Sequence, residues 1–375
     1  MKIVAGGCVF KSEKSAGRQS CAFPGLCVLP SGRWLAGCRA APAKLAVPGQ
    51  HVLISWSDDQ GKSWRVPFSP FPLQKIDGQP GLFRTVQFTA LGSRQVLAVL
   101  YWVDASDLTR PFFNEETEGL LDSRIFLSRS GDDGETWSEP ELISTPPFDI
   151  PTPITGPVLL LPDGSWACQY ELNKRYYDTA VWRHSSVLSF SRDEGKTWPE
   201  HKLVSNDPDN RIFYWDQRVN VLPDGTIFDV FWTYDRQAAV YRNIHAAESR
   251  DSGRTWSESW DTGVPGQPAN VQPAGAGRLL MVYVDRTGPS EIKARLSSDQ
   301  GRTWPKETEL VVYRNQAATQ TRRKKTMQDA WAEMGDFSVG LPITGLLPDG
   351  DVLVFYYAGP ETDSTDIRWC RIRID

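Results

Sequence analysis

Short runs of apolar, β-favouring residues alternate with tight turns along most of this chain. Two such runs are Val158-Leu159-Leu160 and Thr226-Ile227-Phe228, and each lies beside a turn of the type Leu-Pro-x-Gly. Turns of this type occur at residues 29–32, 161–164, 222–225 and 347–350. Short apolar runs bounded by Pro and Gly are typical of β-strands joined by hairpin turns. The pattern therefore predicts many short antiparallel strands.

A second repeat marks a different set of turns. The phrase Ser-x-Asp-x-Gly-x-Thr/Ser-Trp occurs at residues 57–64, 130–137, 191–198, 249–256 and 297–304. The Asp carboxylate can accept hydrogen bonds from turn amides, the Gly can take a positive φ, and the Trp can cover the turn against the sheet. Internal repetition on this scale indicates an array of supersecondary units, usually a solenoid or a propeller.

The two repeats together define a unit of four strands. In three units the Gly of the first turn precedes the Trp of the second by 31 to 34 residues, which leaves room for three short strands, and the residues after the Trp supply a fourth. Four antiparallel strands are a propeller blade. Six units can be counted, so we expect residues 1–375 to form one all-β domain, a six-bladed β-propeller. We expect the N-terminal strand near residues 2–6 to complete the last blade and close the ring, which removes exposed sheet edges.

Composition agrees with a turn-rich all-β protein and narrows its partners. The chain holds 30 Gly and 27 Pro, and its net charge of −5 argues against a surface for nucleic acid or anionic membrane. The six cysteines show no metal-type spacing and are expected to be free thiols in a reducing compartment. We expect no cofactor and no metal, with Ca²⁺ in the Asp-rich loops left open.

The beginning of the chain bears on location. It lacks the apolar core of a secretory signal, and no apolar run approaches the length that spans a membrane. We therefore expect a cytoplasmic protein, or a secreted one if a signal has been removed.

A propeller gathers its functional residues at one mouth of the central channel, where the innermost strand of each blade starts and the second strand ends. Polar and aromatic residues are concentrated at these positions: Arg39, Arg84, Asp104, Glu171, Tyr214, Trp215, Asp216, Arg218, Tyr234 and Arg286, with His184 in a loop nearby. Rings stack on sugar faces, and charged groups fix hydroxyls or an acid function. The set therefore predicts a carbohydrate site, although each single Asp or Arg is more often a turn cap or a surface ion pair.

Glycoside cleavage needs a carboxylic acid that protonates the leaving oxygen and a second group on the opposite side of the sugar ring. We expect Asp216 and Glu171 to be this pair, with Asp104 in reserve. Strand alternation would place Asp216 and Arg218 on one side of an innermost strand, and a structural salt bridge is the alternative interpretation.

The remaining candidates are assigned to substrate binding. We expect arginines to position the substrate and Trp215 to stack on it; the predicted binding residues are Arg39, Arg84, Arg218, Arg286, Trp215, Tyr214, Tyr234 and His184. For residues 327–334 a solvated loop is the default expectation, and a short helix over the mouth is the alternative.

The Ser-x-Asp-x-Gly-x-Thr/Ser-Trp repeats and the unit count resemble the Asp boxes of the sialidase (neuraminidase) superfamily, also called BNR-repeat proteins. The resemblance covers nearly the whole chain and implies the propeller fold. It does not imply one activity, because this propeller serves hydrolases, lyases and binding modules.

The resemblance weakens at the residues that bind and cleave sialic acid. Ala22 stands where the family has the first arginine that grips the sialate carboxylate, and the second arginine position falls near Trp232. The tyrosine nucleophile's region offers Phe337 and Leu341 instead, while Asp216 lines up with the family's assisting glutamate. Without the arginine clamp a sialate carboxylate would lose its charge-assisted bonds. These departures from the family pattern therefore favour a glycan other than sialic acid as the ligand.

Three functions remain open from the sequence. The leading hypothesis is an exo-acting glycoside hydrolase for an unidentified acidic sugar. The second is a carbohydrate-binding propeller without catalysis. The third is a lyase for uronic-acid glycans, in which Arg84 and Arg218 would neutralise the carboxylate while His184 or a Tyr takes the proton.

Overall fold

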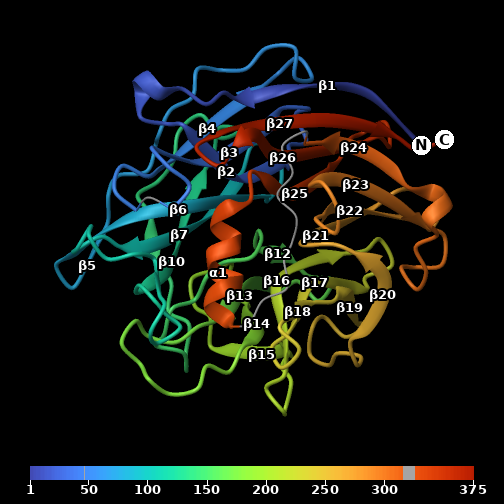
Figure 1. Ribbon diagram of the computed structural model, residues 1–375. Helices are drawn as coiled ribbons and strands as arrows, with labels where there is room; N and C mark the ends of the chain where they lie inside the picture. The colour runs from blue at the N-terminus through green and yellow to red at the C-terminus, as the bar shows by residue number, and fades with distance from the viewer. Residues whose placement is uncertain (46, 316–325) are drawn as a thin grey trace.

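The computed structural model describes residues 1–45, 47–315 and 326–375. These residues form 27 strands, which are arranged in five sheets of four to seven strands and one two-stranded sheet. The sheets follow one another along the chain and are stacked as blades in a propeller-like arrangement (Figure 1). The all-β fold predicted from the turn repeats is therefore confirmed.

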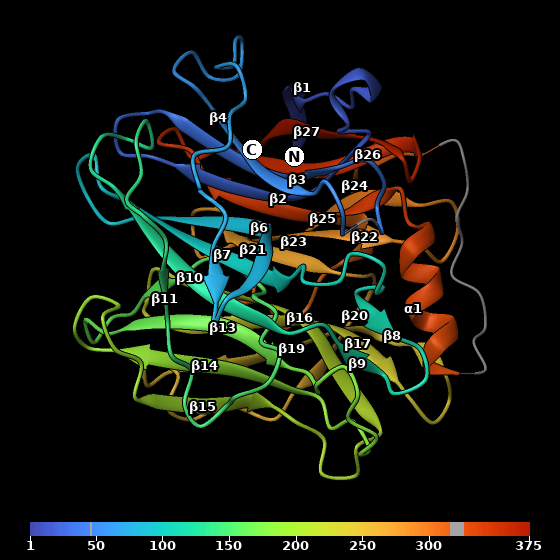
Figure 2. The same ribbon diagram turned by 90° about the vertical axis from the view of Figure 1, so that its left-hand side faces the viewer.

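The largest sheet joins the two ends of the chain. Its strands are β25 (Val339–Leu346), β26 (Val352–Glu361), β27 (Ser364–Arg373), β1 (Lys2–Phe10), β2 (Ser20–Val28), β3 (Trp34–Ala41) and β4 (His51–Ser57). Strand β1 pairs antiparallel with β27 from Lys2↔Arg373 to Phe10↔Ile367. The two termini lie side by side in Figures 1 and 2. The predicted pairing of the N-terminal strand with the last strands is confirmed.

Four further sheets and one hairpin complete the β-structure. The second sheet contains β5 (Lys75–Ile76), β6 (Gln79–Ala90), β7 (Val96–Asp104), β10 (Ser123–Ser130) and β11 (Glu141–Leu142). The third contains β12 (Leu159–Leu160), β13 (Trp166–Leu172), β14 (Ser185–Ser191) and β15 (Glu200–Ser205). The fourth contains β16 (Ile212–Val221), β17 (Ile227–Asp235), β18 (Val240–Tyr241), β19 (Asn243–Ser249) and β20 (Trp260–Pro265). The fifth contains β21 (Ala269–Pro273), β22 (Leu279–Asp285), β23 (Glu291–Ser297) and β24 (Leu310–Arg314), and the hairpin is β8 (Phe113–Asn114) with β9 (Gly119–Leu120).

The number of separate sheets differs from the six expected blades. Strands β25–β27 with β1 and strands β2–β4 are hydrogen-bonded into one sheet through a single parallel pair, Ser20↔Thr365. The Thr365 hydroxyl strengthens this junction because it donates to the carbonyl of Cys21 at 2.9 Å. Whether this sheet counts as one blade or two decides the blade number, which stays a prediction.

All five Ser-x-Asp-x-Gly-x-Thr/Ser-Trp phrases form the same turn. In the third, the Gly195 amide donates to Ser191 Oγ (2.8 Å), and the Thr197 amide and hydroxyl donate to the two oxygens of Asp193 (2.9 and 2.6 Å). These bonds hold the pKa of Asp193 below its usual range. Gly195 has a φ of 83°, which only glycine adopts at little cost. The role predicted for each position of the phrase is confirmed.

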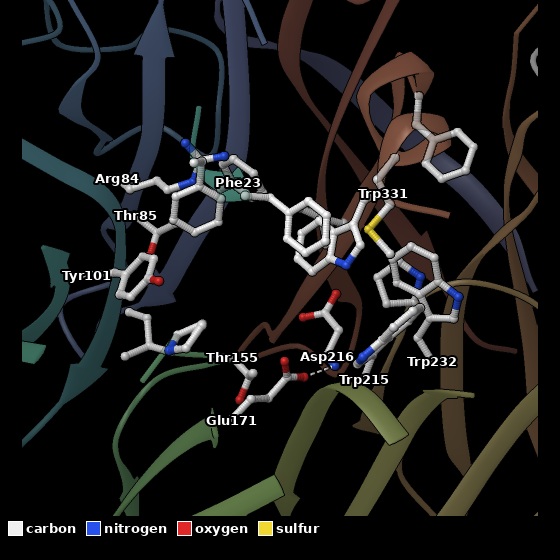
Figure 3. Close-up of a pocket in the computed structure, with 18 of the residues that line it drawn as sticks. Phe23, Arg84, Thr85, Tyr101, Thr155, Glu171, Trp215, Asp216, Trp232 and Trp331 are labelled. Atoms are coloured by element: carbon white, nitrogen blue, oxygen red, sulfur yellow. Dashed lines mark hydrogen bonds between the residues drawn. The ribbon is translucent and has the colours of Figure 1, made fainter. Parts of the chain in front are cut away.

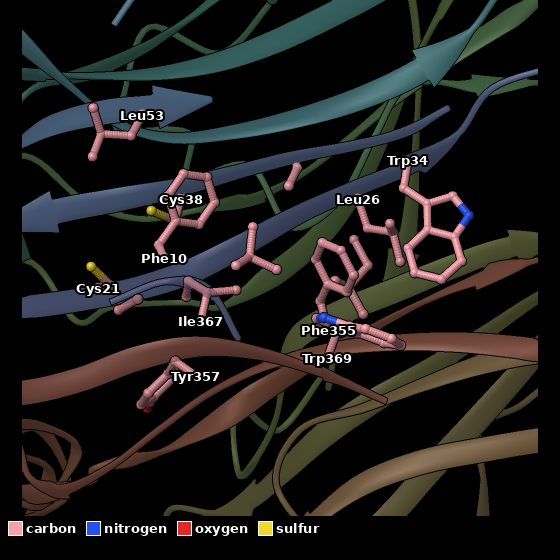
Figure 4. Close-up of a cluster of buried hydrophobic side chains, with 14 of the residues drawn as sticks. Phe10, Cys21, Leu26, Trp34, Cys38, Leu53, Phe355, Tyr357, Ile367 and Trp369 are labelled. Atoms are coloured by element: carbon pink, nitrogen blue, oxygen red, sulfur yellow. The ribbon is translucent and has the colours of Figure 1, made fainter. Parts of the chain in front are cut away.

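Apolar side chains fill the space between the two halves of the seven-stranded sheet. Leu26 and Trp34 from β2 and β3, with Phe355 and Trp369 from β26 and β27, belong to one buried cluster (Figure 4). The rings of Trp34 and Trp369 meet edge to face, with their centres 5.2 Å apart. Aromatic burial of this kind is the main favourable term in packing sheet against sheet.

One α-helix is present in the described residues, α1 (Met327–Asp336), along with two short 3₁₀ turns, Lys14–Ala16 and Lys306–Thr308. Thr326 caps α1: its hydroxyl accepts from the Asp329 amide, and the Asp329 side chain accepts from the Thr326 amide. The default expectation of a solvated loop at residues 327–334 was wrong, and the alternative, a short helix, is present. Figure 2 shows α1 at one edge of the stacked sheets, on the same side as β8 and β9.

Over the described residues, α1 and the other helical turns are too short or too polar to cross a bilayer.

We expect Trp198→Ala to lower the free energy of unfolding by about 3–5 kcal/mol, because it empties a core site. The Trp198 indole is 3% exposed, and its Nε1 donates to the Gly195 carbonyl at 3.2 Å. The urea midpoint measures the effect. Lys196→Ala, at an exposed position of the same turn, should change stability by less than about 0.5 kcal/mol. Equal midpoints for the two variants would show that the Trp does not support the turn.

Candidate functional site

A cavity of about 370 Å³ opens among the innermost strands, beside α1. Of the residues predicted from the sequence, Arg84, Glu171, Trp215, Asp216, Arg218 and Arg286 line it. Figure 3 shows Phe23 and Arg84 on one side, Glu171, Asp216 and Trp215 on a second, and Trp232 and Trp331 on a third. Residues distant in the sequence therefore share one pocket.

Bulges in four innermost strands direct side chains into this cavity. Phe23 in β2, Arg84 in β6, Asp216 in β16 and Leu341 in β25 each lie where the strand register shifts. Phe23, Asp216 and Leu341 have positive φ angles of 54°, 52° and 49°. A non-glycine residue in this region costs about 1–3 kcal/mol and persists where the surroundings demand it. Such bulges are common next to active sites, where they re-aim a side chain.

The bulge in β16 creates the central contact of the site. Asp216 and Gln217 together stand opposite one residue of β17, Phe231, between the pairs Trp215↔Trp232 and Arg218↔Val230. Asp216 Oδ1 lies 2.7 Å from Arg218 Nη2. The predicted proximity of Asp216 and Arg218 is present, but a bulge produces it in place of regular alternation. Arg218 Nη1 also donates to the carbonyl of Thr155, which links this strand to the neighbouring sheet.

The Asp216 carboxyl holds its proton more tightly than an ordinary aspartate. Its pKa is raised to about 6: burial is the largest cause, the Arg218 guanidinium opposes the rise, and the negative charge of Glu171 adds to it. The side chain is 19% exposed, on its cavity side. A carboxyl of this kind can donate a proton near neutral pH.

Glu171 approaches Asp216 from the next sheet. It stands near the end of β13, and its Oε1 accepts the hydrogen bond of the Asp216 amide. Its Oε2 lies 3.5 Å from His184 Nε2. The His184 ring stacks on Phe213, with centres 5.6 Å apart, and does not line the cavity. His184 therefore lies behind Glu171, away from any ligand in the cavity.

Arg84 is held between two aromatic rings. Its guanidinium carbon lies 5.3 Å from the centre of Phe23 and 4.4 Å from that of Phe112, and Nη1 donates to Gln50 Oε1 at 3.1 Å. Burial lowers its pKa to about 10. Among the described residues no carboxylate forms an ion pair with Arg84. A rigid guanidinium of this kind is suited to bind the acid group of a ligand.

Arg286 and Trp215 line the cavity but are also engaged behind it. Arg286 donates to the carbonyls of Gln267 (2.8 Å) and Val339 (2.7 Å). The Trp215 ring stacks on Tyr234, with centres 5.0 Å apart and planes 10° apart. Tyr234 therefore supports Trp215 from behind and does not line the cavity itself.

Three other predicted residues lie outside the cavity. Asp104 ends β7 and pairs with Arg110 at 2.9 Å, so it does not meet Asp216. Arg39 is fully buried and donates to Gln50 Oε1 (2.8 Å) and to the Lys44 carbonyl (2.9 Å), which places it behind Arg84. The Tyr214 ring packs on Phe231 and His245, with centres 5.4 and 5.9 Å away. We therefore correct these three assignments, together with His184 and Tyr234: each stands near the correct strand end, but none of the five lines the cavity.

The residues of the outer wall of the cavity were not among those predicted from the sequence. Trp331 of α1 stacks on Phe113, with ring centres 4.3 Å apart and planes 15° apart, and Phe112 covers Arg84. Trp331, Phe112 and Phe113 all line the cavity. The Pro111-Phe112-Phe113 run in a loop and the Trp within residues 327–334 were the available signals.

Lys44, also missed, fastens α1 to the loop after β3. Its Nζ donates to the carbonyls of Met334 (2.6 Å) and Phe337, at the C-terminal end of the helix, where carbonyl dipoles favour a cation. Nζ also lies 5.6 Å from the ring centres of Phe337 and Tyr357. Burial lowers the pKa of Lys44 well below its usual value.

Comparison with known proteins now bears on this geometry. Residues 98–317 match the family model described as BNR repeat-like domain, which covers more than half of the chain. The chain belongs to the BNR repeat-like domain family. No curated protein matches it significantly in sequence.

Several solved structures share the fold of this chain. A protein of unknown function from Dyadobacter fermentans is 20% identical, with a TM-score of 0.75 over 100% of this chain and 99% of the other. The Hadza microbial sialidase Hz136 is 17% identical, with a TM-score of 0.69 over 98% and 68% of the two chains. The intramolecular trans-sialidase from Ruminococcus gnavus is 13% identical, with a TM-score of 0.62 over 98% and 97%. At these identities the likeness shows the fold and nothing finer.

We expect the Asp216 carboxyl to titrate near pH 6 in carbon-13 NMR spectra of the folded protein. Because this pKa lies above the usual aspartate value of 3.8, the contribution of Asp216 to stability falls as pH rises from about 4 to about 6. Glu171→Gln should lower the midpoint, because it removes a like charge, and Arg218→Met should raise it. A wild-type midpoint near 3.8 would contradict this description of the site.

We expect Lys44→Met to loosen α1. Loss of the two bonds to helix carbonyls should speed hydrogen exchange of the C-terminal amides of α1 by about tenfold or more, as for any locally weakened element. Mass-spectrometric exchange measures this, with β17 peptides as the internal reference. Lys62→Met, at an exposed position, is the matched control and should leave exchange in α1 unchanged. Equal exchange in both variants would show that Lys44 does not hold the helix.

Proposed function

We propose that this BNR-family protein is a glycosidase-like enzyme that removes a terminal acidic sugar from a glycan and is not a true sialidase. The observation that supports this most strongly is the Asp216 carboxyl, which a strained bulge presents to a cavity walled by aromatic rings and whose pKa is about 6. A buried carboxyl with a raised pKa in a pocket is a candidate catalytic acid.

In this proposal Asp216 is the general acid. At pH 6 about half of the Asp216 side chains carry a proton, and that proton would pass to the glycosidic oxygen as the bond to the sugar carbon breaks. Arg218, 2.7 Å away, stabilises the carboxylate that remains. Glu171 is the second carboxylate: it lines the same cavity and would assist a water or the sugar cation, while its Oε1 also accepts the bond of the Asp216 amide.

Binding of the sugar is assigned to the opposite walls. Arg84, held between Phe23 and Phe112, would bind the acid group of the sugar. Trp215 and Trp331 offer ring faces or edges on which the sugar can lie. A cavity of about 370 Å³ walled by α1 has room for roughly one terminal sugar, which supports exo action.

The family resemblance supports a sugar substrate, while the departures from it argue against sialic acid. Several fold neighbours carry sialidase in their names. However, Ala22 stands where the family has an arginine, and Phe337 stands in the region where the family has its tyrosine.

We treat the seven-stranded sheet as two blades, so that six blades of a single domain surround the cavity.

A carbohydrate-binding propeller without catalysis is the second candidate. It is favoured by one observation: Asp216 and Glu171 are both engaged within the protein, by Arg218 and by the Asp216 amide. The lyase hypothesis loses its proposed His base, because His184 lies behind Glu171 and outside the cavity.

Release of chromophore from a panel of aryl glycosides, including uronides and a sialoside, tests the proposal. We expect turnover of an acidic glycoside other than the sialoside, a rate that falls as pH rises above about 6, and a loss of about 10²–10⁴-fold in Asp216→Asn. Asp163→Asn removes an arginine-paired carboxylate from the turn between β12 and β13 and should keep the wild-type rate.

Calorimetry on the same panel separates the two candidates. Binding without turnover would replace the enzyme by the binding module. Full activity of both Asp216→Asn and Glu171→Gln would remove these residues from the mechanism, and an unsaturated product would restore the lyase.

A further inference from the structure

The β16 bulge displaces backbone amides from the strand ladder, and side chains take over their hydrogen bonds. The Asp216 amide donates to Glu171 Oε1, the Arg218 amide to Asp229 Oδ1 at 3.0 Å, and the Val219 amide to Gln169 Oε1 at 3.1 Å. Glu171 and Gln169 both belong to β13, whereas Asp229 belongs to the partner strand β17. Asp229 therefore satisfies a bulge amide from within its own sheet.

A buried aspartate such as Asp229 lowers the stability of the fold unless it has a role beyond packing. Its side chain is fully buried, and within the described part of the chain its Oδ2 has no hydrogen-bond partner. A buried polar atom without a partner costs about 1–3 kcal/mol. Other residues of β17, Phe228, Val230 and Phe231, are apolar core residues. An apolar side chain at this position would cost less free energy to bury than Asp229. The bond to the Arg218 amide is therefore a reason for an aspartate here.

We propose that Asp229 is a positioning residue, which fixes the Arg218 backbone in the bulge and so holds the Asp216 side chain in the cavity. The effect on catalysis rests on the proposed function, but the effect on the bulge does not. Arg218 is the link: its amide binds Asp229, and its guanidinium binds Asp216. A change at Asp229 reaches Asp216 through this one residue.

The surroundings of Asp229 suit this role. The groups that face it are the Arg218 and Val230 amides, the Arg218 guanidinium and the carboxylate of Glu171. Burial raises its pKa well above the usual aspartate value, and the bonds from the two amides oppose this rise. The contact with the bulge is the bond that Oδ1 accepts from the Arg218 amide, and a neutral oxygen can accept it as well as a charged one. The geometry therefore calls for an acceptor at this position.

This requirement defines the experiment. Asp229→Asn keeps an oxygen acceptor in the same place, whereas Asp229→Leu removes it at similar volume. Amide exchange by NMR reports directly on the Arg218 N–H, and the carbon-13 titration of Asp216 reports on the site. Asp235→Asn is the matched control: Asp235 is equally buried in β17 but pairs with Arg211 (2.9 Å) and Arg242 (2.6 Å), away from the bulge.

In Asp229→Leu we expect exchange of the Arg218 amide to rise by about 100-fold and the Asp216 midpoint to move by about half a unit or more. If the proposed enzyme is confirmed, kcat should fall more than tenfold with a smaller change in KM. Asp229→Asn should restore both the slow exchange and the wild-type midpoint. Asp235→Asn should lower the thermal midpoint of unfolding and leave the Asp216 titration unchanged.

Two results would overturn the inference. One is an Asp229→Leu protein whose Arg218 amide and Asp216 midpoint equal those of the wild type. The other is an Asp229→Asn protein whose Asp216 midpoint shifts, because this would show that Asp229 acts through its charge. If Asp229→Leu does not fold, Asp229→Ala replaces it with the same expected results. Absence of any glycosidase activity would remove only the kinetic part, since exchange and titration need no substrate.

Discussion

The candidate site depends on one departure from regular β-structure, the bulge in β16. A regular strand would pair every amide of Asp216, Gln217 and Arg218 with β17 or leave it to solvent, and would carry the side chains up and down in turn. The bulge instead gives Asp216 a φ of 52° and brings its carboxylate and the Arg218 guanidinium to 2.7 Å. The free-energy cost of this backbone conformation is offset by side-chain oxygens that accept the bulge amides, those of Glu171, Asp229 and Gln169. The same constraint therefore sets where the carboxyl points and how firmly it stays there.

The electrostatics of the site follow from this geometry. Burial of Asp216 raises its pKa, and the positive charges of Arg218 and, to a smaller extent, Arg286 limit the rise. Glu171 acts on Asp216 in two ways, because its Oε1 fixes the Asp216 backbone while its charge disfavours ionisation of the Asp216 side chain. An aspartate with a raised pKa beside a second carboxyl group is an arrangement from which general acid catalysis can start. On the far side, Arg84 is held between aromatic rings, and no carboxylate in the described part of the chain pairs with it, so its charge remains directed at the cavity.

Much of this arrangement could be predicted because turns are encoded locally. The Asp193 turn needs only a carboxylate, a Gly and a hydroxyl at fixed spacing, and the pairing of β1 with β27 follows from closing a ring. The gathering of Asp216, Glu171 and Arg84 followed from strand ends alone. Side-chain direction could not be predicted, because a bulge changes it without a sequence signal of its own. Tyr214, two residues before Asp216, faces Phe231 and not the cavity, and Asp104 is captured by the nearby Arg110. The outer wall depends on contacts between distant segments, such as Trp331 with Phe113, which no local pattern contains.

The repeated turns hold the sheets together, whereas the bulges, which differ from strand to strand, supply side chains to the cavity. The five Asp turns are nearly identical because each closes a hairpin in the same way, and none of their residues lines the cavity. The bulges at the other ends differ in what they present: an aromatic ring at Phe23, a cation at Arg84, an acid at Asp216 and an aliphatic chain at Leu341. One backbone device in different strands thus delivers four kinds of chemistry to one cavity. A scaffold of this design can change its ligand by changing the bulged residue while the turns that hold the sheets stay the same, so shared fold and shared turns say little about the substrate.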